Sequence, residues 1–253
     1  MKKYHIKLKK GIPKVVATIS SKGAIASVLQ IPLHERDFDI VEIRLDDIGH
    51  YKDWIKDLKK LEASDIPVLL TIRNKGEGGA WEDTLNIKRR DLFIEAINNG
   101  AVSMVDLEVN GDLLTKSLAD TAKRHGVRIL VSVHHFHGTP SLSALKIIVK
   151  KGIKFGADIV KIATKVCNEK DKRNLTKLLV ETEFPLCVIG MGTASSDTRI
   201  IFPCLGSVLT YGYLDKASAP GQYSTDILDS LLRQLSPKYN QEVITKRQIL
   251  EYA

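Results

Sequence analysis

Eight short apolar segments recur along this chain, and most are followed by a stretch with the spacing of an amphipathic helix. Such an alternation of strands and helices is typical of parallel α/β folds. At 253 residues, either two smaller domains or one (β/α)8 barrel would fit the length, and eight repeats favour the barrel. We therefore expect an α/β (β/α)8 TIM barrel, formed as one domain by residues 1–253. The predicted strands are residues 15–19, 40–46, 67–72, 102–109, 128–133, 157–164, 185–189 and 206–211.

The predicted helices lie between these strands, and glycines mark the ends of several of them. Gly100, Gly126 and Gly152 each follow a helical pattern, as a C-terminal cap would. At the N-terminus, the turn at residues 11–13 would allow residues 4–19 to form a β-hairpin that closes the bottom of the barrel. The helices are expected from about residue 24 and over residues 53–61, 84–98, 112–125, 142–152, 170–182, 195–200, 224–235 and 242–252.

The second predicted strand alternates charged and apolar residues. Glu42, Arg44 and Asp46 alternate with apolar residues along it. Residues two apart in a strand share a face. If the apolar face packs against helices, the charged face points into the barrel, where side chains at the strand ends form the active sites of such folds.

Lys161 interrupts a segment that otherwise reads as a buried strand. An unpaired buried ammonium is costly, and proteins use a lysine in a closed apolar site as an unprotonated amine for Schiff-base chemistry. We expect Lys161 to be such an amine. Taken alone, the residue could instead extend to solvent or pair with a carboxylate of a neighbouring strand.

His134 ends the preceding predicted strand, so its imidazole and Lys161 can face one site. An imidazole titrates near neutral pH and can take and return a proton. The cluster of His134, His135 and His137 could also suggest a metal, but no HxxxH or Cys/His set accompanies it. We predict no metal site and no cofactor.

Two loops carry further candidate residues. Arg73 and Glu77 share a glycine-rich loop that matches neither common phosphate-binding motif, so an anion-binding arginine and a histidine-orienting glutamate are the remaining roles. Ser218 and Gln222 lie on a loop of small residues after the last strand, a segment that could close over a ligand. Either loop could equally be a solvent-exposed turn.

Composition narrows the class of protein. Charged residues make up 27% and hydrophobic residues 43%, which is ordinary for a globular protein. The net charge of +8 would suit an anionic partner, but the basic residues are scattered, so we expect no nucleic-acid partner. No apolar run is long enough to span a membrane, the N-terminus lacks a secretory signal, and three cysteines suggest no disulfide framework. We expect a cytoplasmic protein.

Several of these segments together resemble the type I 3-dehydroquinate dehydratases, the Schiff-base enzymes of the shikimate pathway. Any one motif is weak, but the ordered set spans nearly the whole chain. The resemblance implies a (β/α)8 barrel, a homodimer, no metal, and dehydration of 3-dehydroquinate to 3-dehydroshikimate. The matching segments are residues 42–46, 73–79, 106–108, 132–140, 158–163, 190–199 and 217–222.

The resemblance also implies a role for each candidate residue. Lys161 would form an imine with the substrate ketone, His134 would move the proton, and Glu77 would hold His134 in position. Asp46 would support Arg44. The implied substrate-binding residues are Thr18, Glu42, Arg44, Arg73, Arg199, Ser218 and Gln222.

The chain departs from the family pattern at two positions. His135 stands where the family usually has aspartate, and Thr18 stands where it usually has serine. Two other classes remain open at this point. A class I aldolase would share the lysine but has no reason for Arg199 with Ser218 and Gln222. A basic barrel that binds RNA or a partner without catalysis would not depend on Lys161.

Overall fold

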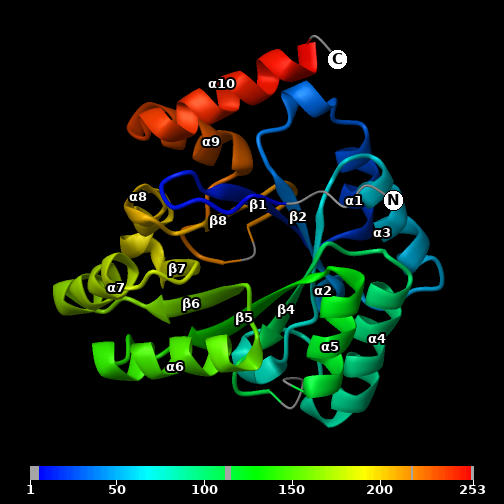
Figure 1. The fold of residues 1–253 in the computed structure, drawn as a ribbon, viewed down its shortest axis with the longest axis horizontal. Helices are drawn as coiled ribbons and strands as arrows, with labels where there is room; N and C mark the ends of the chain where they lie inside the picture. The colour runs from blue at the N-terminus through cyan, green and yellow to red at the C-terminus, as the bar shows by residue number, and fades with distance from the viewer. Residues whose placement is uncertain (1–5, 112–114, 218, 252–253) are drawn as a thin grey trace.

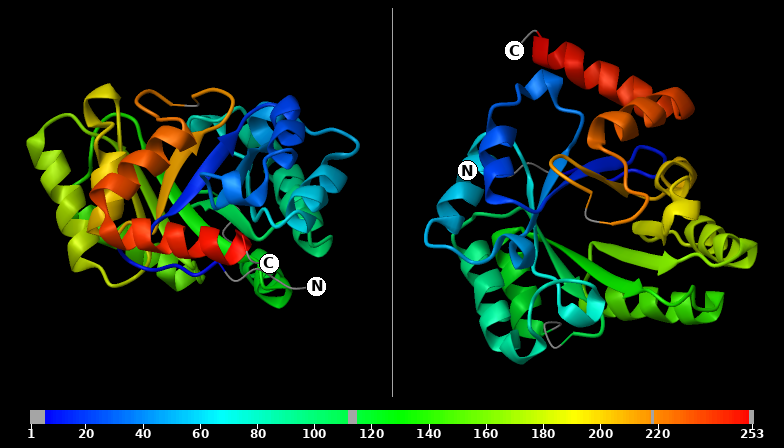
Figure 2. Two further views of the ribbon diagram at one scale, coloured as in Figure 1. Left: turned by 90° about the horizontal axis from the view of Figure 1, so that it is seen from above. Right: turned by 180° about the vertical axis from the view of Figure 1, so that it is seen from behind.

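The computed structural model describes residues 6–111, 115–217 and 219–251. Eight parallel strands form the inner layer and helices form the outer layer (Figures 1 and 2), which confirms the predicted (β/α)8 barrel. The strands are β1 (Lys14–Ile19), β2 (Ile40–Arg44), β3 (Val68–Thr71), β4 (Met104–Glu108), β5 (Arg128–His135), β6 (Ile159–Lys165), β7 (Leu186–Met191) and β8 (Leu209–Tyr213).

The helices lie between successive strands or follow the last one (Figure 1). The α-helices are α1 (Lys22–Leu29), α2 (Leu45–Ile48), α3 (Trp54–Ala63), α4 (Asn86–Asn98), α5 (Lys116–His125), α6 (Leu142–Phe155), α7 (Glu169–Glu181), α8 (Thr198–Leu205), α9 (Thr225–Leu235) and α10 (Pro237–Glu251). The short 3-10 helices are η1 (Leu33–Glu35), η2 (Lys75–Glu77), η3 (Asp83–Leu85) and η4 (Thr193–Ser195).

The barrel is nearly closed. The strands pair in the order β7-β6-β5-β4-β3-β2-β1-β8, and among the described residues β7 and β8 form no ladder with each other. Ser207 bridges this seam, because its hydroxyl accepts the amide of Val188 at 3.1 Å and donates to the carbonyl of Leu209 at 2.9 Å. A backbone bond from Val208 to Leu186 adds a further link across the seam.

Alternate side chains of each strand point to opposite sides of the barrel wall. The outward residues pack with the helices in the larger apolar cluster, whereas a smaller apolar cluster lies inside the barrel. In seven strands, the residue two positions beyond an inward apolar residue can hydrogen-bond or is charged. The inner wall therefore changes from apolar to polar along these strands. The polar side chains gather toward the carboxyl ends of the strands, where they form the site. The pairs are Val16 with Thr18, Ile40 with Glu42, Leu69 with Thr71, Met104 with Asp106, Leu130 with Ser132, Ile159 with Lys161 and Leu209 with Tyr211.

The predicted N-terminal hairpin is not formed in the described part of the chain. Residues 6–12 contain a single antiparallel bridge, from Lys9 to Ile12, and no strand. The segment nevertheless covers the bottom of the barrel, since Ile6 and Leu8 pack against the inner apolar cluster. The carbonyl of Ile6 accepts a hydrogen bond from Arg128 at 2.8 Å. Residues 4 and 5 of the prediction lie outside the described residues.

Several element boundaries differ from the prediction. β2 ends at Arg44, so Asp46 lies on the helical turn α2 and not on the strand. Helix α6 continues through Gly152, where a β-carbon would lie 2.6 Å from Val160 Cγ2; this glycine permits close packing on β6 and does not end the helix. β8 begins later than expected, at Leu209, and α10 begins earlier, at Pro237. The start of the predicted helix over residues 112–125 falls partly on residues outside the described ones.

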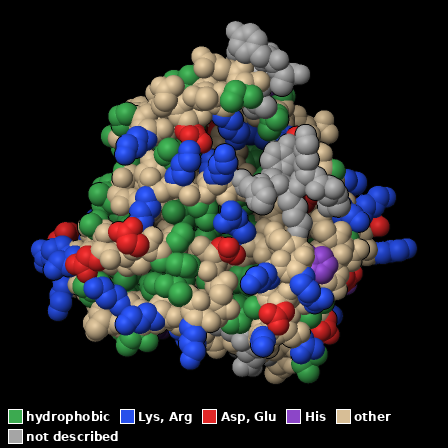
Figure 3. Space-filling model, in the orientation of Figure 1, with side chains coloured by type: hydrophobic (Ala, Val, Ile, Leu, Met, Phe, Trp, Pro, Cys, Tyr) green, Lys and Arg blue, Asp and Glu red, His purple; other side chains and the backbone are tan. Residues whose placement is uncertain are grey.

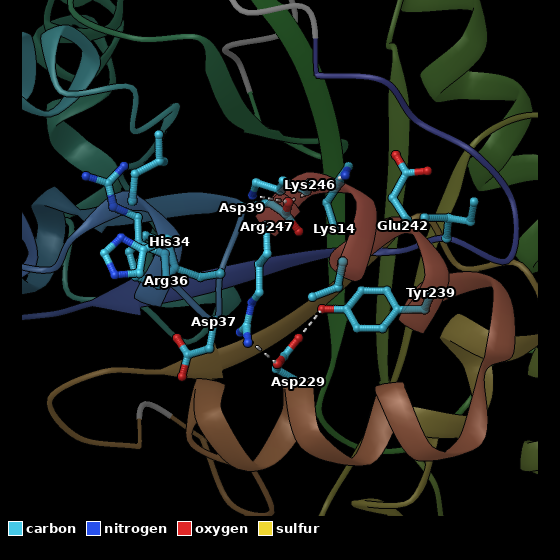
Figure 4. A pocket seen from close by; sticks show the side chains of 14 residues that line it. Lys14, His34, Arg36, Asp37, Asp39, Asp229, Tyr239, Glu242, Lys246 and Arg247 are labelled. Atoms are coloured by element: carbon cyan, nitrogen blue, oxygen red, sulfur yellow. Dashed lines mark hydrogen bonds and ion pairs between the residues drawn. The ribbon is translucent and has the colours of Figure 1, made fainter. Parts of the chain in front are cut away.

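Helix α10 contacts α9 and η1. A hollow between them is lined by both acidic and basic side chains (Figure 4). Tyr239 donates to Asp229 at 2.7 Å, and Asp39 pairs with both Lys14 at 3.5 Å and Lys246 at 3.3 Å. These hydrogen bonds and ion pairs stabilise the packing of α10 against the barrel.

Candidate active site

A cavity of about 130 Å³ lies inside the barrel toward the carboxyl ends of the strands. Side chains from six strands, from helix α8 and from the loops after β3, β5 and β8 line it, so residues far apart in sequence converge on one space. The predicted residues among its lining are Thr18, Glu42, Arg44, Arg73, Glu77, His134, Lys161, Arg199 and Gln222. Ser218, the remaining predicted residue, lies outside the described residues.

Lys161 is buried at the centre of this site, with its side chain 7% exposed. Its Nζ lies 3.5 Å from Asp106 Oδ2, 4.0 Å from Glu42 Oε1 and 4.0 Å from the ring centroid of Tyr211. The expectation of an apolar environment is therefore wrong. The burial of Lys161 was predicted, whereas its surroundings were not. Carboxylates and an aromatic face stabilise positive charge on this nitrogen.

His134 lies on β5, next to β6, and faces the same cavity. Glu77 Oε2 lies 2.9 Å from His134 Nδ1 and accepts the backbone amide of His134 at 3.1 Å. A carboxylate at Nδ1 favours the tautomer with the proton on Nδ1, which leaves Nε2 free to accept a proton. The ring also stacks on Phe136, with centroids 6.3 Å apart.

Burial shifts the proton affinities of this pair in opposite directions. Burial lowers the pKa of His134 well below its ordinary value, and the positive charges of Arg73 and Lys161 lower it further. Burial raises the pKa of Glu77 to about 7, against the attraction of Arg73. Near neutral pH the imidazole is therefore uncharged, which is the state of a general base.

Arg73 is held in a buried network of acids. It donates to Asp106 Oδ2 at 2.6 Å and to the hydroxyl of Ser132 at 2.7 Å, and it pairs with Glu108 at 3.3 Å. Arg89 reaches the other oxygen of Glu108 from helix α4, at 2.8 Å. Burial alone would raise the pKa of Asp106, but Arg73 and Lys161 hold it well below its usual range, so this carboxylate stays charged beside Lys161.

Glu42 and Arg44 are fixed on the adjacent strand. The carboxylate of Glu42 accepts hydrogen bonds from the hydroxyl of Thr18 at 3.0 Å and from that of Thr71 at 2.8 Å. Arg44 donates to both oxygens of Asp46, at 3.0 and 2.7 Å. The support of Arg44 by Asp46 thus holds even though Asp46 lies on α2 and not on the strand.

Arg199 differs from the other buried arginines of the site. Its described hydrogen bonds go to backbone carbonyls, those of Gly221 at 3.1 Å and Tyr211 at 3.4 Å, and no carboxylate of the described residues pairs with it. Burial lowers the pKa of this guanidinium to about 10. A buried guanidinium without an acidic partner is a binding position for an anion. Gln222 lines the cavity beside it.

His135, the departure from the family pattern, does not line the cavity. It follows His134 on β5, so its side chain lies on the other face of the strand. Its Nε2 is buried without a hydrogen-bond partner among the described residues, and burial lowers the pKa of the ring. The substitution therefore leaves the groups around His134 Nδ1 unchanged.

The site also contains residues that were not predicted from the sequence, among them Asp106, Arg89 and Tyr211. The alternation of Asp106 and Glu108 along β4 was a usable signal, because it repeats the charged pattern of β2. Arg89 lies in a run of basic residues that resembles a solvated helix face, and Tyr211 resembles a core aromatic. Within the described part of the chain, no group of three or more His, Cys, Asp or Glu side chains could hold a metal ion.

Comparisons with known proteins agree with this geometry. The family model of type I 3-dehydroquinase matches residues 15–238. The chain belongs to the type I 3-dehydroquinase family. It is 32% identical over 226 residues to 3-dehydroquinate dehydratase of Methanothrix thermoacetophila, covering 89% of this chain and 94% of that relative.

Solved structures of this family share the fold. The 3-dehydroquinate dehydratase of Enterococcus faecalis superposes with a TM-score of 0.78 at 25% identity, covering 91% of this chain and 97% of that one. The type I 3-dehydroquinate dehydratase of Clostridium difficile, solved with covalently modified comenic acid, gives 0.76 at 27% identity, covering 94% of this chain and 98% of that one.

Membership in the family confirms the resemblance found in the sequence. Type I 3-dehydroquinases are lyases that dehydrate 3-dehydroquinate in the shikimate pathway of aromatic amino-acid biosynthesis, typically through a Schiff base, and this chain is such an enzyme. Among the described residues, no helix is both long and apolar enough to cross a membrane.

Proposed function

We propose that this enzyme converts 3-dehydroquinate to 3-dehydroshikimate with Lys161 as the amine that forms the imine and His134 as the residue that moves the proton. One observation carries the proposal. Lys161 and His134, from adjacent strands, line one cavity together with Arg199, whose buried guanidinium has no acidic partner among the described residues. Dehydration of a carboxylated ketone through an imine needs three groups: an amine, a general base and a cation that binds the carboxylate.

The reaction begins with imine formation at Lys161. The Lys161 amine attacks the substrate ketone, and the addition product takes up one proton and loses water to give an iminium; this proton is released again when Lys161 is regenerated as the amine. The iminium acidifies the neighbouring carbon, and His134 Nε2 removes a proton from it. The same imidazole then returns that proton to the departing hydroxyl, which leaves as water, and hydrolysis of the iminium restores Lys161. The net change is the loss of one water molecule from the substrate.

Glu77 takes part by holding the imidazole. Its bonds to Nδ1 and to the backbone amide of His134 fix both the tautomer and the ring orientation. Asp106 and Glu42 favour positive charge on Lys161, first as the ammonium and later as the iminium. The site thus stabilises the charge that makes the neighbouring carbon acidic.

The substrate would lie with its carboxylate toward Arg199. Gln222 would bind the same end, since it follows Gly221, whose carbonyl accepts from Arg199. The family resemblance implies the same role for Ser218, which lies outside the described residues. Arg44 and Glu42 line the cavity from β2 and Arg73 from the loop after β3, and they would bind ring hydroxyls, with Thr18 holding Glu42. Charge complementarity therefore fixes one orientation of the ring.

The other classes fit the site less well. A class I aldolase would explain Lys161 but not the unpaired Arg199. An RNA-binding barrel would need a continuous basic surface. On the face drawn in Figure 3, lysines and arginines stand among acidic and apolar side chains and form no such surface.

Turnover of 3-dehydroquinate by single variants tests the proposal. Lys161→Ala should have no measurable activity, because no imine can form, and His134→Ala should lose about 10²- to 10⁴-fold in kcat. Lys165→Ala is the matched control, since Lys165 lies on the same strand but is exposed. Formation of the conjugated product can be followed by ultraviolet absorbance. Activity of Lys161→Ala equal to that of the control would refute the assignment.

We also propose that the enzyme is a cytoplasmic homodimer. Neighbouring helices α6, α7 and α8 expose large apolar side chains, each more than 40% accessible, as a face covered by a second copy would. These are Ile147, Ile153, Val180, Ile201 and Leu205. Sedimentation equilibrium measures the assembly state, and a monomer at micromolar concentration would contradict the homodimer.

A further inference from the structure

Tyr211 lies on the inward face of β8 beside the reacting nitrogen. Its side chain is buried, and Lys161 Nζ stands over its ring, 4.0 Å from the ring centroid. A cation within about 6 Å of an aromatic centroid is attracted by the negative face of the ring, and the attraction is strongest where water is excluded. None of the proposed steps of the dehydration assigns a role to this aromatic ring.

The ring differs from the other groups that favour charge on Lys161. Asp106 and Glu42 can accept a proton, and each is also engaged elsewhere, Asp106 by Arg73 and Glu42 by two hydroxyls. An aromatic face takes no proton. It can therefore stabilise the nitrogen both as an ammonium and as an iminium without reacting with either.

The backbone around Tyr211 holds the ring in place. The carbonyl of Tyr211 accepts from Arg199 at 3.4 Å, and the hydroxyl of Thr210 donates to the carbonyl of Arg199 at 2.7 Å. Pairing with β1 fixes the residue opposite Val16. The ring position thus follows from the strand and from the anchor of Arg199.

The phenol hydroxyl contributes nothing to this arrangement. It is buried and has no hydrogen-bond partner among the residues that the structure describes. Burial, and the negative charge of Glu42, raise the pKa of Tyr211 well above its ordinary value, so the hydroxyl stays neutral. Because an unsatisfied buried hydroxyl is unfavourable, its removal should not destabilise the fold.

We propose that the aromatic face of Tyr211 is a further catalytic group, which stabilises the positive charge of the iminium on Lys161. The inference rests on the proposed Schiff-base function. It assigns the effect to the electrons of the ring and none to the hydroxyl. Tyr211→Phe should therefore form as much imine as the wild type, within about twofold.

Substitution of position 211 by phenylalanines with increasing fluorination tests the ring directly. Fluorine withdraws electrons from the face of the ring while the shape changes little. Because the ring stabilises the ammonium as well, trapping is compared in the pH range where the free Lys161 side chain reacts as the neutral amine. There the fraction of Lys161 trapped by borohydride with 3-dehydroquinate should fall stepwise, reaching about thirty-fold in the imine equilibrium for pentafluorophenylalanine. Thermal unfolding of each variant shows whether the fold is kept.

A second variant covers the case in which the fluorinated proteins do not fold. Tyr211→Leu removes the ring, so the ammonium of Lys161 loses stabilisation and the amine reacts at lower pH, while less imine accumulates. The pH profile of trapping should move to lower pH in Tyr211→Leu and stay in place in Tyr211→Phe. A variant affected only in packing would lose imine without any movement of the profile.

The outcomes separate this inference from the proposed function. If the wild type is trapped at Lys161 and fluorination changes nothing, the role of the ring is refuted and the Schiff-base function stands. If the wild type forms no adduct on Lys161, the proposed function itself fails. A stepwise loss with fluorination supports both.

Discussion

Glu77 and His134 titrate as one pair, because their side chains meet at 2.9 Å in a buried site. A single added proton removes the general base, whichever of the two side chains it binds. On the imidazole it occupies Nε2, and on Glu77 it replaces the acceptor that keeps the proton of the ring on Nδ1. The pair is active only when it lacks this proton.

The pH dependence of kcat follows from this pair. Since the pKa of Glu77 is raised to about 7, kcat should rise with pH through about 7. In Glu77→Gln the neutral amide cannot take up this proton, so the rise of kcat should move to the lower pH at which the buried His134 becomes protonated. The value of kcat should also fall, because the imidazole ring is held less firmly in its orientation. Steady-state rates between pH 5 and 9 measure both effects, and an unchanged midpoint in Glu77→Gln would contradict the coupling.

The sequence predicted individual residues where a strand end carried an unusual side chain. Lys161 and His134 were predicted in this way, Arg73 from the loop after the third strand, and Glu42 and Arg44 from alternation along the second strand. The sequence did not predict what surrounds Lys161, because Asp106 and Tyr211 come from strands distant in the chain. The expected apolar environment failed for this reason: an inward position on a strand shows burial but does not reveal which residues face it.

Hydrogen bonds hold the loop after β3 in place, with Glu77 and Gly78 lining the cavity. Lys75 donates to the carbonyl of Trp81, Trp81 donates to that of Arg73, and Ala80 donates to Asp46 at 3.1 Å. Gly79 makes this arrangement possible, because a β-carbon there would lie 2.1 Å from the carbonyl oxygen of Arg73.

Gly79→Ala should therefore displace the loop and separate Glu77 from His134. We expect kcat to fall by at least about tenfold, since a small misplacement of a catalytic group costs up to about 10²-fold. Gly23→Ala is the matched control, because a β-carbon there meets nothing within 4 Å. That control lies in α1 and should keep full activity with equal or higher stability. Steady-state turnover and thermal unfolding check both variants, and wild-type kcat in Gly79→Ala would contradict the role of the loop.

At the scale of elements, periodicity predicted each of the eight strands but not their limits. β2 stops at Arg44 because the chain turns into α2, and the apolar Leu45 continued the alternation beyond the strand. Gly152 read as a helix end, although its lack of a side chain serves the contact with Val160. A glycine that ends a helix and one that permits close packing look the same in a single sequence.

At the scale of the whole molecule, the barrel creates the site by bringing together groups that no single element holds. Its inner wall is apolar at the bottom and charged toward the carboxyl ends. Acids collect around Lys161 and Arg73, whereas Arg199 stays without one among the described residues. This uneven distribution of charge arises from the barrel as a whole and supports the binding of a carboxylated ketone.

The most direct test is to add borohydride to the enzyme with 3-dehydroquinate and to map the modified peptide by mass spectrometry. Reduction makes the imine permanent, so the account predicts one adduct, on Lys161, in the wild type and also in His134→Ala, which lacks the proton shuttle but keeps the amine. No adduct should form without substrate. An unmodified Lys161 peptide, or an adduct on another lysine, would contradict the assignment of Lys161 as the imine-forming amine.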